Sequence, residues 1–220
     1  MADVDPSALL KIRMTILAST LVTAKGAPVE PGAVPSDLKT AVPDYCSLLA
    51  AANGFELVDG LFRVFGVGGN SYGQNALVWN KSSWRSPYGV PPSVVFLGEN
   101  IFGDQYGVDT SAGSLLLMSC EGGKFKRLAF KTVTELVESI VVGKDIQGLE
   151  IELVRASRRN GLLPSVSEHL SFAVPLICGG TPDEDNLEVL EAQAHLDLLG
   201  QIIAQTRGTP DGTRIRGFGS

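Results

Sequence analysis

Three carboxylates lie within eleven residues in the middle of the chain, and their types and spacing could do chemistry. They are Glu99, Asp104 and Asp109, in the stretch "ENIFGDQYGVDTSAGSLLLMSCEGG". Carboxylates that converge can bind a divalent cation, and two of them can act as general acid and general base. The structural alternative is a hairpin, in which Gly103 and Asp104 form the tight turn, Asp104 accepts backbone N–H groups, and Gly113 forms the next turn.

The spacing of these acids favours the hairpin. Asp104 and Asp109 are five positions apart, an odd number, so on one strand their side chains point to opposite faces of the sheet. A shared site would need them on one face. We therefore predict no catalytic residue and no metal site here, and we expect Gly103, Asp104 and Gly107 to matter first for folding.

The cysteines and histidines offer little further chemistry. Cys46, Cys120 and Cys178 are far apart and form no CxxC motif, which is typical of reduced thiols in a cytosolic protein. We expect Cys46 and Cys178, which stand in apolar runs, to be buried. The two histidines, His169 and His195, are isolated, which argues against a zinc site.

One nucleophile–base pair remains to be considered. Cys120 and His195 could form it only through a tertiary contact, because the chain has no local nucleophile motif such as G-x-S-x-G. We expect His195 to pack on a helix or to face solvent. The prediction is therefore a protein without catalytic residues and without a cofactor.

Composition and charge restrict the class of protein and of partner. With 44% hydrophobic and 19% charged residues, the 220-residue chain is typical of a soluble globular protein. Its net charge of −6 argues against nucleic acid as a partner and permits a basic protein partner. No apolar run reaches the roughly 18–20 residues of a membrane helix, so we predict no membrane contact. Residues 4–23 only partly imitate a signal peptide, so we predict an amphipathic helix there and a cytoplasmic location.

The elements that position these residues follow from hydrophobic periodicity and turn signals. The helix predicted at 44–53 ends at Asn53-Gly54, and a capping box of Thr132 and Glu135 begins another. Helices are predicted at 4–23, 44–53, 132–143, 149–160 and 191–206; strands at 61–65, 93–99, 104–109, 114–120, 124–130, 172–180 and 213–218; and a strand or short helix at 76–80. Turns of a few residues join the strands. The predicted fold class is therefore α+β, with a mainly antiparallel twisted sheet and helices packed around it.

The order of these motifs resembles the SUKH superfamily, the Smi/Knr-like family. The resemblance rests first on "VPDYCSLLAAANGF" (42–55), "ENIFGDQYGVDTSAGSL" (99–115) and "KTVTELVESIV" (131–141). Further along, "RRNGLLP" (158–164), "VPLICGG" (174–180), "DNL" (185–187) and "QIIAQTRGTPDGTRIR" (201–216) are similar to the C-terminal part of bacterial members. The resemblance implies a core at 35–142 and a helix–strand–helix extension at 143–220. Residues 1–34, a helix and a Pro/Gly-rich connector, lie outside it.

The resemblance implies binding rather than catalysis. Bacterial SUKH proteins often act as immunity proteins that neutralise a toxin by direct contact, which here would be a basic toxin domain. A regulatory scaffold with another protein partner and a small acid-dependent hydrolase are the alternatives. From the net charge, the partner-binding candidates are acids expected on exposed loops: Glu99, Asp109, Asp183 and Glu184.

The remaining motif positions have structural roles in this interpretation. Residues 182–191 are predicted as a turn that leads into the helix at 191–206. Asp183, Glu184 and Asp185 either cap that following helix or present charge to a basic partner, and the cap is the preferred interpretation. A double glycine before them permits close backbone approach or unusual dihedral angles. The structural positions are Asn53, Gly54, Gly103, Asp104, Gly107, Gly113, Gly179 and Gly180.

Overall fold

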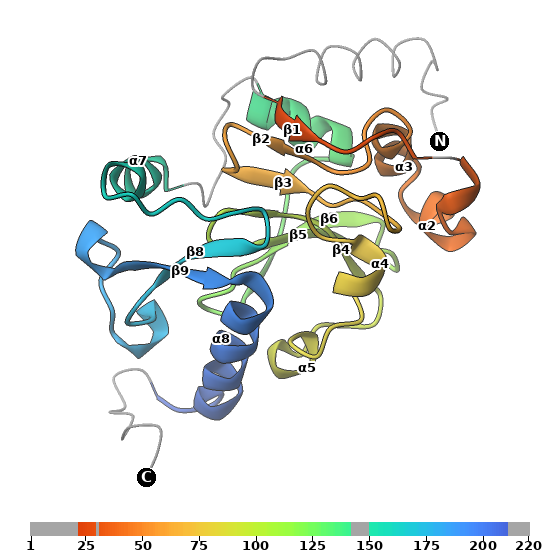
Figure 1. Cartoon of the computed structure of the whole chain (residues 1–220). Helices are drawn as coiled ribbons and strands as arrows, with labels where there is room; N and C mark the ends of the chain where they lie inside the picture. Colours follow the sequence, from red (N-terminus) through yellow and green to blue (C-terminus); the bar gives the residue numbers. More distant parts are fainter. Residues whose placement is uncertain (1–21, 30, 142–149, 211–220) are drawn as a thin grey trace.

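The computed structural model describes residues 22–29, 31–141 and 150–210, and it shows two sheets with helices around them (Figure 1). The larger sheet is antiparallel, and its seven strands follow the order of the chain. They are β1 (Val22–Lys25), β2 (Phe55–Leu57), β3 (Phe62–Val64), β4 (Val94–Asn100), β5 (Gln105–Asp109), β6 (Ser114–Met118) and β7 (Phe125–Arg127). The predicted α+β fold class with a mainly antiparallel sheet is confirmed.

Helices and a small second sheet complete the described part of the chain. The α-helices are α2 (Ser36–Ala41), α3 (Pro43–Leu49), α4 (Ala76–Trp79), α5 (Arg85–Tyr88), α6 (Val133–Val141), α7 (Ile151–Arg159) and α8 (Ala192–Thr206). The short 3-10 helices are η1 (Pro31–Ala33), η2 (Leu176–Cys178) and η3 (Glu184–Asn186). The second sheet pairs β8 (Glu168–Phe172) with β9 (Leu187–Glu191), also antiparallel.

Local sequence signals set the ends of several elements. At the start of α6 the backbone N–H of Glu135 donates to Thr132 Oγ1 at 3.1 Å, as the capping box predicts. Asp44, in the first turn of α3, accepts a hydrogen bond from the backbone N–H of Thr134 at 3.0 Å. This carboxylate therefore satisfies an N-terminal donor of α6 and joins two helices.

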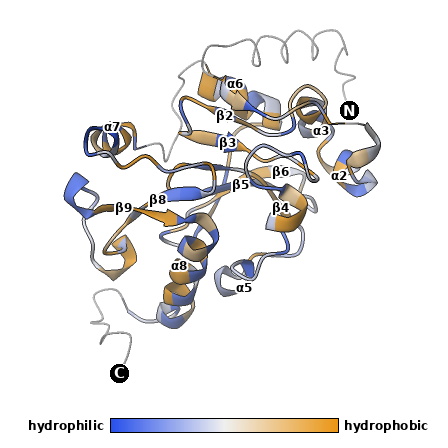
Figure 2. Ribbon diagram, viewed as in Figure 1, coloured by the Kyte–Doolittle hydropathy of each residue, from blue (hydrophilic) through white to orange (hydrophobic). Residues whose placement is uncertain are grey.

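The apolar side chains form two separate clusters. The larger cluster lies on the seven-stranded sheet and includes the apolar side of α8, with Leu196, Leu199 and Ile202. Figure 2 shows apolar and polar residues alternating along this helix, as a surface helix requires. The smaller cluster joins Val154 of α7, Leu170 and Phe172 of β8, and Leu187 of β9 to Leu61, Ile101 and Phe102 from loops of the sheet.

These clusters define two parts of the described structure. We call residues 151–191, with α7, β8 and β9, the peripheral unit, and the seven-stranded sheet with α2–α6 and α8 the body. In Figure 1 the peripheral unit lies to the left of the body, and α8 returns beneath the sheet. The chain thus leaves the body after α6 and comes back to it in α8.

Two predicted elements of the peripheral unit are wrong. The predicted strand 172–180 ends at its first residue, and η2 follows. The cause is Asn186, whose side chain accepts from the backbone N–H of Val174 at 2.8 Å and donates to the carbonyl of Val174 at 2.9 Å, so this residue cannot continue a ladder. Residues 187–191, predicted as a turn, form β9 instead.

The remaining predictions are confirmed, differ in their bounds or fall on undescribed residues. The helix predicted at 44–53 ends at Leu49 as α3, and of the strand predicted at 124–130 only residues 125–127 form β7. The helices at 132–143, 149–160 and 191–206 are confirmed as α6, α7 and α8, and residues 76–79 form the helix α4. Of the helix predicted at 4–23, the described residues Val22 and Thr23 belong to β1 instead. The rest of that helix and the strand predicted at 213–218 lie outside the described residues.

Candidate functional site

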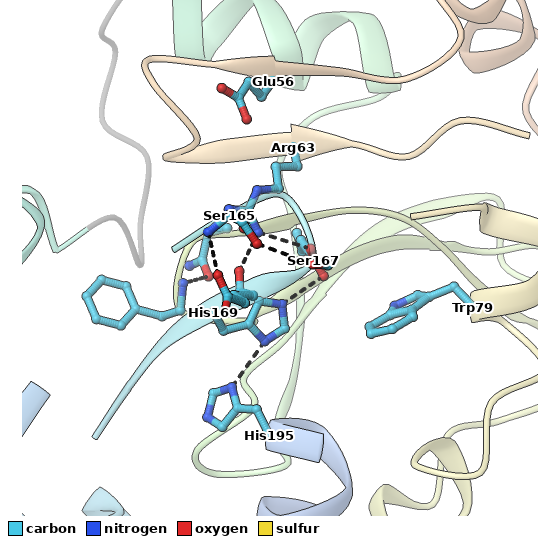
Figure 3. A network of polar contacts seen from close by, with 12 residues as sticks. Glu56, Arg63, Trp79, Ser165, Ser167, His169 and His195 are labelled. Carbon is cyan, nitrogen blue, oxygen red and sulfur yellow. Dashed lines mark hydrogen bonds and ion pairs between the residues drawn. The ribbon is translucent and has the colours of Figure 1, made fainter. Parts of the chain in front are cut away.

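The most concentrated group of charged side chains in the described structure lies inside the protein, around Glu99. Glu99 stands on β4 and is 0% exposed. One carboxylate oxygen, Oε1, lies 3.7 Å from the NH1 atom of Arg63, and Oε2 lies 3.1 Å from Nε2 of His169. Figure 3 shows His169 between Arg63 and His195. We call Arg63, Glu99, His169 and His195 the interior network.

The two histidines of the chain are in direct contact. His169 on β8 and His195 on α8 face each other through their Nδ1 atoms, which are 3.1 Å apart (Figure 3). One of the two nitrogens must donate and the other accept. Both rings are buried, and His195 Nε2 has no hydrogen-bond partner among the described residues. Burial, and then the neighbouring His169, lower the pKa of His195 to about 3, so His195 is neutral at pH 7.

A glutamine and a tryptophan extend the interior network to α4. The side-chain amide of Gln105 donates to Glu99 Oε2 at 3.1 Å and to the carbonyl of Gly103 at 3.0 Å. The Gln105 carbonyl oxygen accepts from Trp79 Nε1 at 2.7 Å. Because both ends of this amide are bonded, its orientation is fixed, and its N–H group points at the buried carboxylate.

Arg63 connects the sheet to the chain just before β8. Its guanidinium donates to the backbone carbonyls of Glu168 at 2.7 Å and Ser165 at 2.8 Å. Arg63 is 3% exposed, because residues 165–168 of the peripheral unit cover that face of β3.

The charge of Glu99 is stabilised by its neighbours. Burial on its own would raise the pKa of this carboxyl, but His169, Arg63 and the Gln105 amide together hold it below its usual range. Glu99 is therefore an ionised interior group that lies beside the Arg63 guanidinium and the His169 ring. Its place among the exposed, partner-binding acids is a wrong prediction, since no part of its side chain reaches the surface.

Asp104 has a separate role in the turn between β4 and β5. Its Oδ1 accepts from the backbone N–H of Cys120 at 2.9 Å and its Oδ2 from the Asn100 amide at 3.1 Å. Asn100 Oδ1 in turn accepts from the N–H groups of Phe102 and Asp104. The prediction that Asp104 binds backbone N–H is confirmed, although Asn100 holds the turn itself. Burial raises the pKa of Asp104 above its usual value.

Asp109 stands at the far end of the same hairpin. Its Oδ1 accepts from the hydroxyl of Ser111 at 2.7 Å and from the backbone N–H of Ser111 at 3.0 Å. These bonds, the hydroxyl first, lower the pKa of Asp109. Glu99, Asp104 and Asp109 thus bind three different sets of partners. Within the described ranges, no group of three or more metal-ligating side chains occurs.

The cysteines do not form a reactive centre with these groups. The Cys120 thiol donates to the carbonyl of Phe102 at 3.1 Å, and burial raises its pKa well above the usual value. It takes a different partner from His195, so the nucleophile–base pair is not formed. Cys46 is half-buried, whereas Cys178 is exposed because it lies in η2 rather than in the predicted buried strand.

The acids of the peripheral unit lie on its surface. Asp183 Oδ1 accepts from the backbone N–H of Asn186 at 3.1 Å, so it caps the 3-10 helix η3. The predicted cap of the helix at 191–206 is wrong, because Glu191 caps α8 by accepting from the backbone N–H of Ala194. Glu184 lies 3.5 Å from the Arg159 guanidinium in an exposed ion pair. Asp183, Glu184 and Asp185 are all exposed. These acids, and not Glu99, are available to a partner.

The predicted structural positions are under conformational or steric constraint. Asn53 is buried and bonds the backbone N–H and carbonyl of Val67, both at 2.8 Å. Gly103 has φ +88, and a Cβ there would lie 2.6 Å from His169 Nδ1. Gly54, Gly113 and Gly179 also have positive φ, and at Gly107 and Gly180 a Cβ would meet a backbone carbonyl oxygen. The absence of a side chain at Gly103 therefore leaves room for the imidazole ring of His169.

A groove of about 440 Å³ lies on the body, between α2, α4 and the start of β4. Asn80 in its wall pairs with both backbone groups of Phe96, at 2.8 and 2.7 Å, and Arg85 donates to a backbone carbonyl of β4. The exposed charges at its rim, Asp37 and Lys81, are opposite in sign. The side chains of Asn80 and Arg85 thus cover an open edge of β4 beside the groove. The opposite charges of Asp37 and Lys81 at the rim show no preference for the charge of a ligand.

Sequence reasoning missed half of the interior network and the polar residues around it. Arg63, Asn100 and Gln105 were not singled out, and His169 was taken as isolated, although each stands beside apolar residues in a strand or tight turn. A charged or polar residue within such a run is the available signal, because burial requires it to find partners. The signal names no partner, since Glu99 and His169 are remote in sequence.

Comparison with known proteins identifies the fold alone. Neither a protein-family model nor a curated protein sequence matches this chain. The chain is similar in structure to Atu4351 from Agrobacterium tumefaciens, known from a crystal structure. The TM-score is 0.62 at 12% sequence identity, over 85% of this chain and 87% of that one. No helix in the described part of the chain is long and apolar enough to cross a bilayer.

Proposed function

We propose that this chain is a non-enzymatic protein-binding module, and specifically an immunity-type protein that neutralises a bacterial toxin by direct contact. The SUKH-like order of its motifs supports a binding role. One structural observation carries the proposal: the mid-chain acids are each committed to the fold, in the interior network, in the Asn100 turn and in the Ser111 turn.

A hydrolase would need a different arrangement. A catalytic acid or base has to reach a substrate, directly or through one water. Glu99, His169 and His195 are each 0–1% exposed, and His195 Nδ1 is occupied by His169. Asp104 binds the backbone and an asparagine amide instead of facing a cleft. These groups are therefore better suited to joining elements than to turning over a substrate.

The charge distribution supports a basic partner. The net charge is −6, and exposed acids gather on η3 of the peripheral unit: Asp183, Glu184 and Asp185. Such a field accelerates encounter with a cationic protein and disfavours nucleic acid. In this proposal the partner is a basic toxin domain, the two proteins meet in the cytoplasm, and neither a cofactor nor a metal takes part.

Co-expression with the proteins encoded beside this gene tests the proposal. A tagged full-length chain should capture one of them in a stoichiometric complex, and cells producing that protein should survive only when this chain is present. Capture without any protection of the cells would favour the regulatory scaffold. If none of the neighbouring proteins is bound and none is toxic, the immunity role is wrong. Turnover of a substrate that Asp104→Asn abolishes in a folded protein would support the hydrolase.

A further inference from the structure

His169 joins the peripheral unit to two elements of the body, β4 and α8, through titratable side chains. Its Nε2 lies 3.1 Å from Glu99 on β4, and its Nδ1 lies 3.1 Å from His195 on α8. The strand β4 and the helix α8 both pack in the larger apolar cluster, whereas β8 packs in the smaller one. His169 is therefore inserted from one unit into a polar slot of the other.

The other links across this boundary include ion-pair, backbone and aromatic contacts. Arg158 of α7 lies 3.4 Å from Asp59, and Glu121 accepts from the backbone N–H of Leu176 at 2.8 Å. The N–H of Leu170 donates to the carbonyl of Ile101 at 2.8 Å, and Arg63 reaches the carbonyls of Glu168 and Ser165. Phe102 of the body stacks on Phe172 of β8, with ring centroids 5.8 Å apart. A change at His169 thus acts at the centre of the contact between the two units.

The number of hydrogens between the two Nδ1 atoms determines how many of the two histidine rings can be charged while they remain in contact. With one hydrogen between the two Nδ1 atoms, the Nδ1–Nδ1 contact is satisfied, and His169 Nε2 lies 3.1 Å from Glu99 Oε2. When both rings are imidazolium, both Nδ1 atoms carry a hydrogen, and two N–H donors face each other across 3.1 Å. The doubly charged pair is therefore incompatible with the closed arrangement.

The surroundings do not compensate a second positive charge. The charged groups around the pair are Glu99 from β4, Arg63 from β3 and Asp104 from the β4–β5 turn. Glu99 is already shared by Arg63 and His169, and Asp104 is bonded to Asn100 and the backbone. A charge on His195 would thus be buried beside a cation with no anion free to pair with it, which is costly.

We propose that Glu99, His169 and His195 form an acid-sensitive latch, which holds the peripheral unit on the body while at most one ring is charged and releases it when both are. The latch goes beyond the proposed binding function and does not depend on it. Its effect would be to loosen the unit that carries the exposed acids of η3 when the surroundings become acidic.

Linkage fixes the direction and the pH window. Burial and then His169 lower the pKa of His195 from 6.5 to about 3 in the closed state. After release His195 faces water and regains an ordinary pKa near 6.5. Between these values only the released state binds the extra proton. The closed state is therefore fully favoured above about pH 6.5, and its closing constant falls by up to about tenfold for each pH unit below that.

Hydrogen exchange of backbone amides in the full-length chain tests the latch. Exchange is followed from about pH 7.5 to about pH 5, corrected for the intrinsic rate, across the range in which histidine titrates. A released two-stranded sheet is only marginally stable, so amides of β8 and β9 should lose protection. Relative to amides of β5 and β6, we expect a loss approaching tenfold per pH unit. Equal loss in all four strands would show global acid unfolding and overturn the latch, as would constant protection of β8 and β9.

Two variants distinguish the effect of protonating His195 from the effect of other titrating groups. His195→Gln keeps an amide donor that cannot be protonated, so its β8 and β9 protection should no longer depend on pH. Asp185→Asn changes an exposed acid of the same unit that lies outside the latch, and it should retain the dependence of the unchanged chain. A dependence that survives in His195→Gln, or vanishes in Asp185→Asn, overturns the proposal.

Histidine NMR of the unchanged chain keeps the test decisive if His195→Gln does not fold. Only two histidines contribute signals. The His195 ring should stay neutral while β8 and β9 are protected, and should take up its proton in step with their loss of protection. A His195 ring that titrates at an ordinary pKa while these amides remain protected would overturn the latch.

Discussion

The interior network and the exposed acids at η3 (Asp183, Glu184 and Asp185) contain the same types of charged residue in different roles. Glu99 in the interior network is fully buried between Arg63 and His169, whereas Glu184 at η3 is exposed and lies 3.5 Å from Arg159. The buried carboxylate is needed because Arg63 and His169 are shielded from water, so water cannot take the place of the carboxylate beside them. The exposed one pairs with a cation that water already solvates. Burial, rather than residue type, decides which acid supports the fold and which remains available to a partner.

Removing the buried carboxylate should give the largest effect. Glu99→Ala leaves Arg63 and His169 in the interior without their anion, so we expect the free energy of unfolding to fall by about 3–5 kcal/mol. Denaturant titration followed by circular dichroism measures it. Asp109→Asn, at the end of β5, is the matched control and should unfold like the unchanged chain. If both variants lose the same small amount, the interior network contributes nothing particular to stability.

Two glycine variants test whether the close contact between the Gly103 turn and His169 contributes to the stability of the buried group. Gly103 and Gly113 both have positive φ, +88 and +60, so alanine should cost about 1–2 kcal/mol of backbone strain at either position. At Gly113 a Cβ meets nothing within 4 Å, but at Gly103 it would lie 2.6 Å from His169 Nδ1. Overpacking of this kind adds about 1–3 kcal/mol.

We therefore expect Gly103→Ala to lower the free energy of unfolding by more than Gly113→Ala, and the difference measures the contact with His169. Thermal unfolding of the two variants side by side is sufficient. The histidine signals should also shift in Gly103→Ala and remain in place in Gly113→Ala. Equal losses and unmoved histidine signals would mean that the turn does not support His169.

The hairpins and helices of the body could be predicted from the sequence because their signals are local. The capping box at Thr132 and Glu135 and the short turns around Gly103 and Gly113 act within a few residues, and the structure confirms them. The end of β8 depends on Asn186, which lies 12 positions beyond Val174. Periodicity could not show that contact, so the strand was predicted at 172–180, which begins where β8 ends, instead of at 168–172.

The interior network lay beyond prediction for a related reason. Alternation tells which face of a strand a residue takes, but not which element will cover that face. Arg63 was therefore not singled out, although residues 165–168 cover it. Glu99 was assigned to an exposed loop, although it stands inside β4. Glu191 caps α8, whereas Asp183, which was assigned to that helix, instead caps η3 through the backbone N–H of Asn186, three positions away.

Loss of that cap should have a moderate effect. Asp183→Ala leaves the backbone N–H of Asn186 without its side-chain acceptor, and we expect the free energy of unfolding to fall by about 1 kcal/mol. Asp183→Asn keeps an acceptor oxygen and should recover most of it. Denaturant titration of both variants with the unchanged chain decides the matter: if alanine and asparagine behave alike, the cap contributes only through its charge.

Reversing an exposed charge on the same turn should change stability least, and it sharpens the contrast with Glu99. Glu184→Lys breaks a surface ion pair with Arg159, so the free energy of unfolding should change by no more than about 1 kcal/mol. If the partner is a cationic toxin, its association rate constant should fall by up to about tenfold at low salt, while the dissociation rate constant changes little. Stopped-flow association with the captured toxin, repeated at high salt, measures this loss, which screening should remove. An association rate that Glu184→Lys leaves unchanged at every salt concentration would show that this turn does not face the partner, and the acids that steer it would have to be sought on the body.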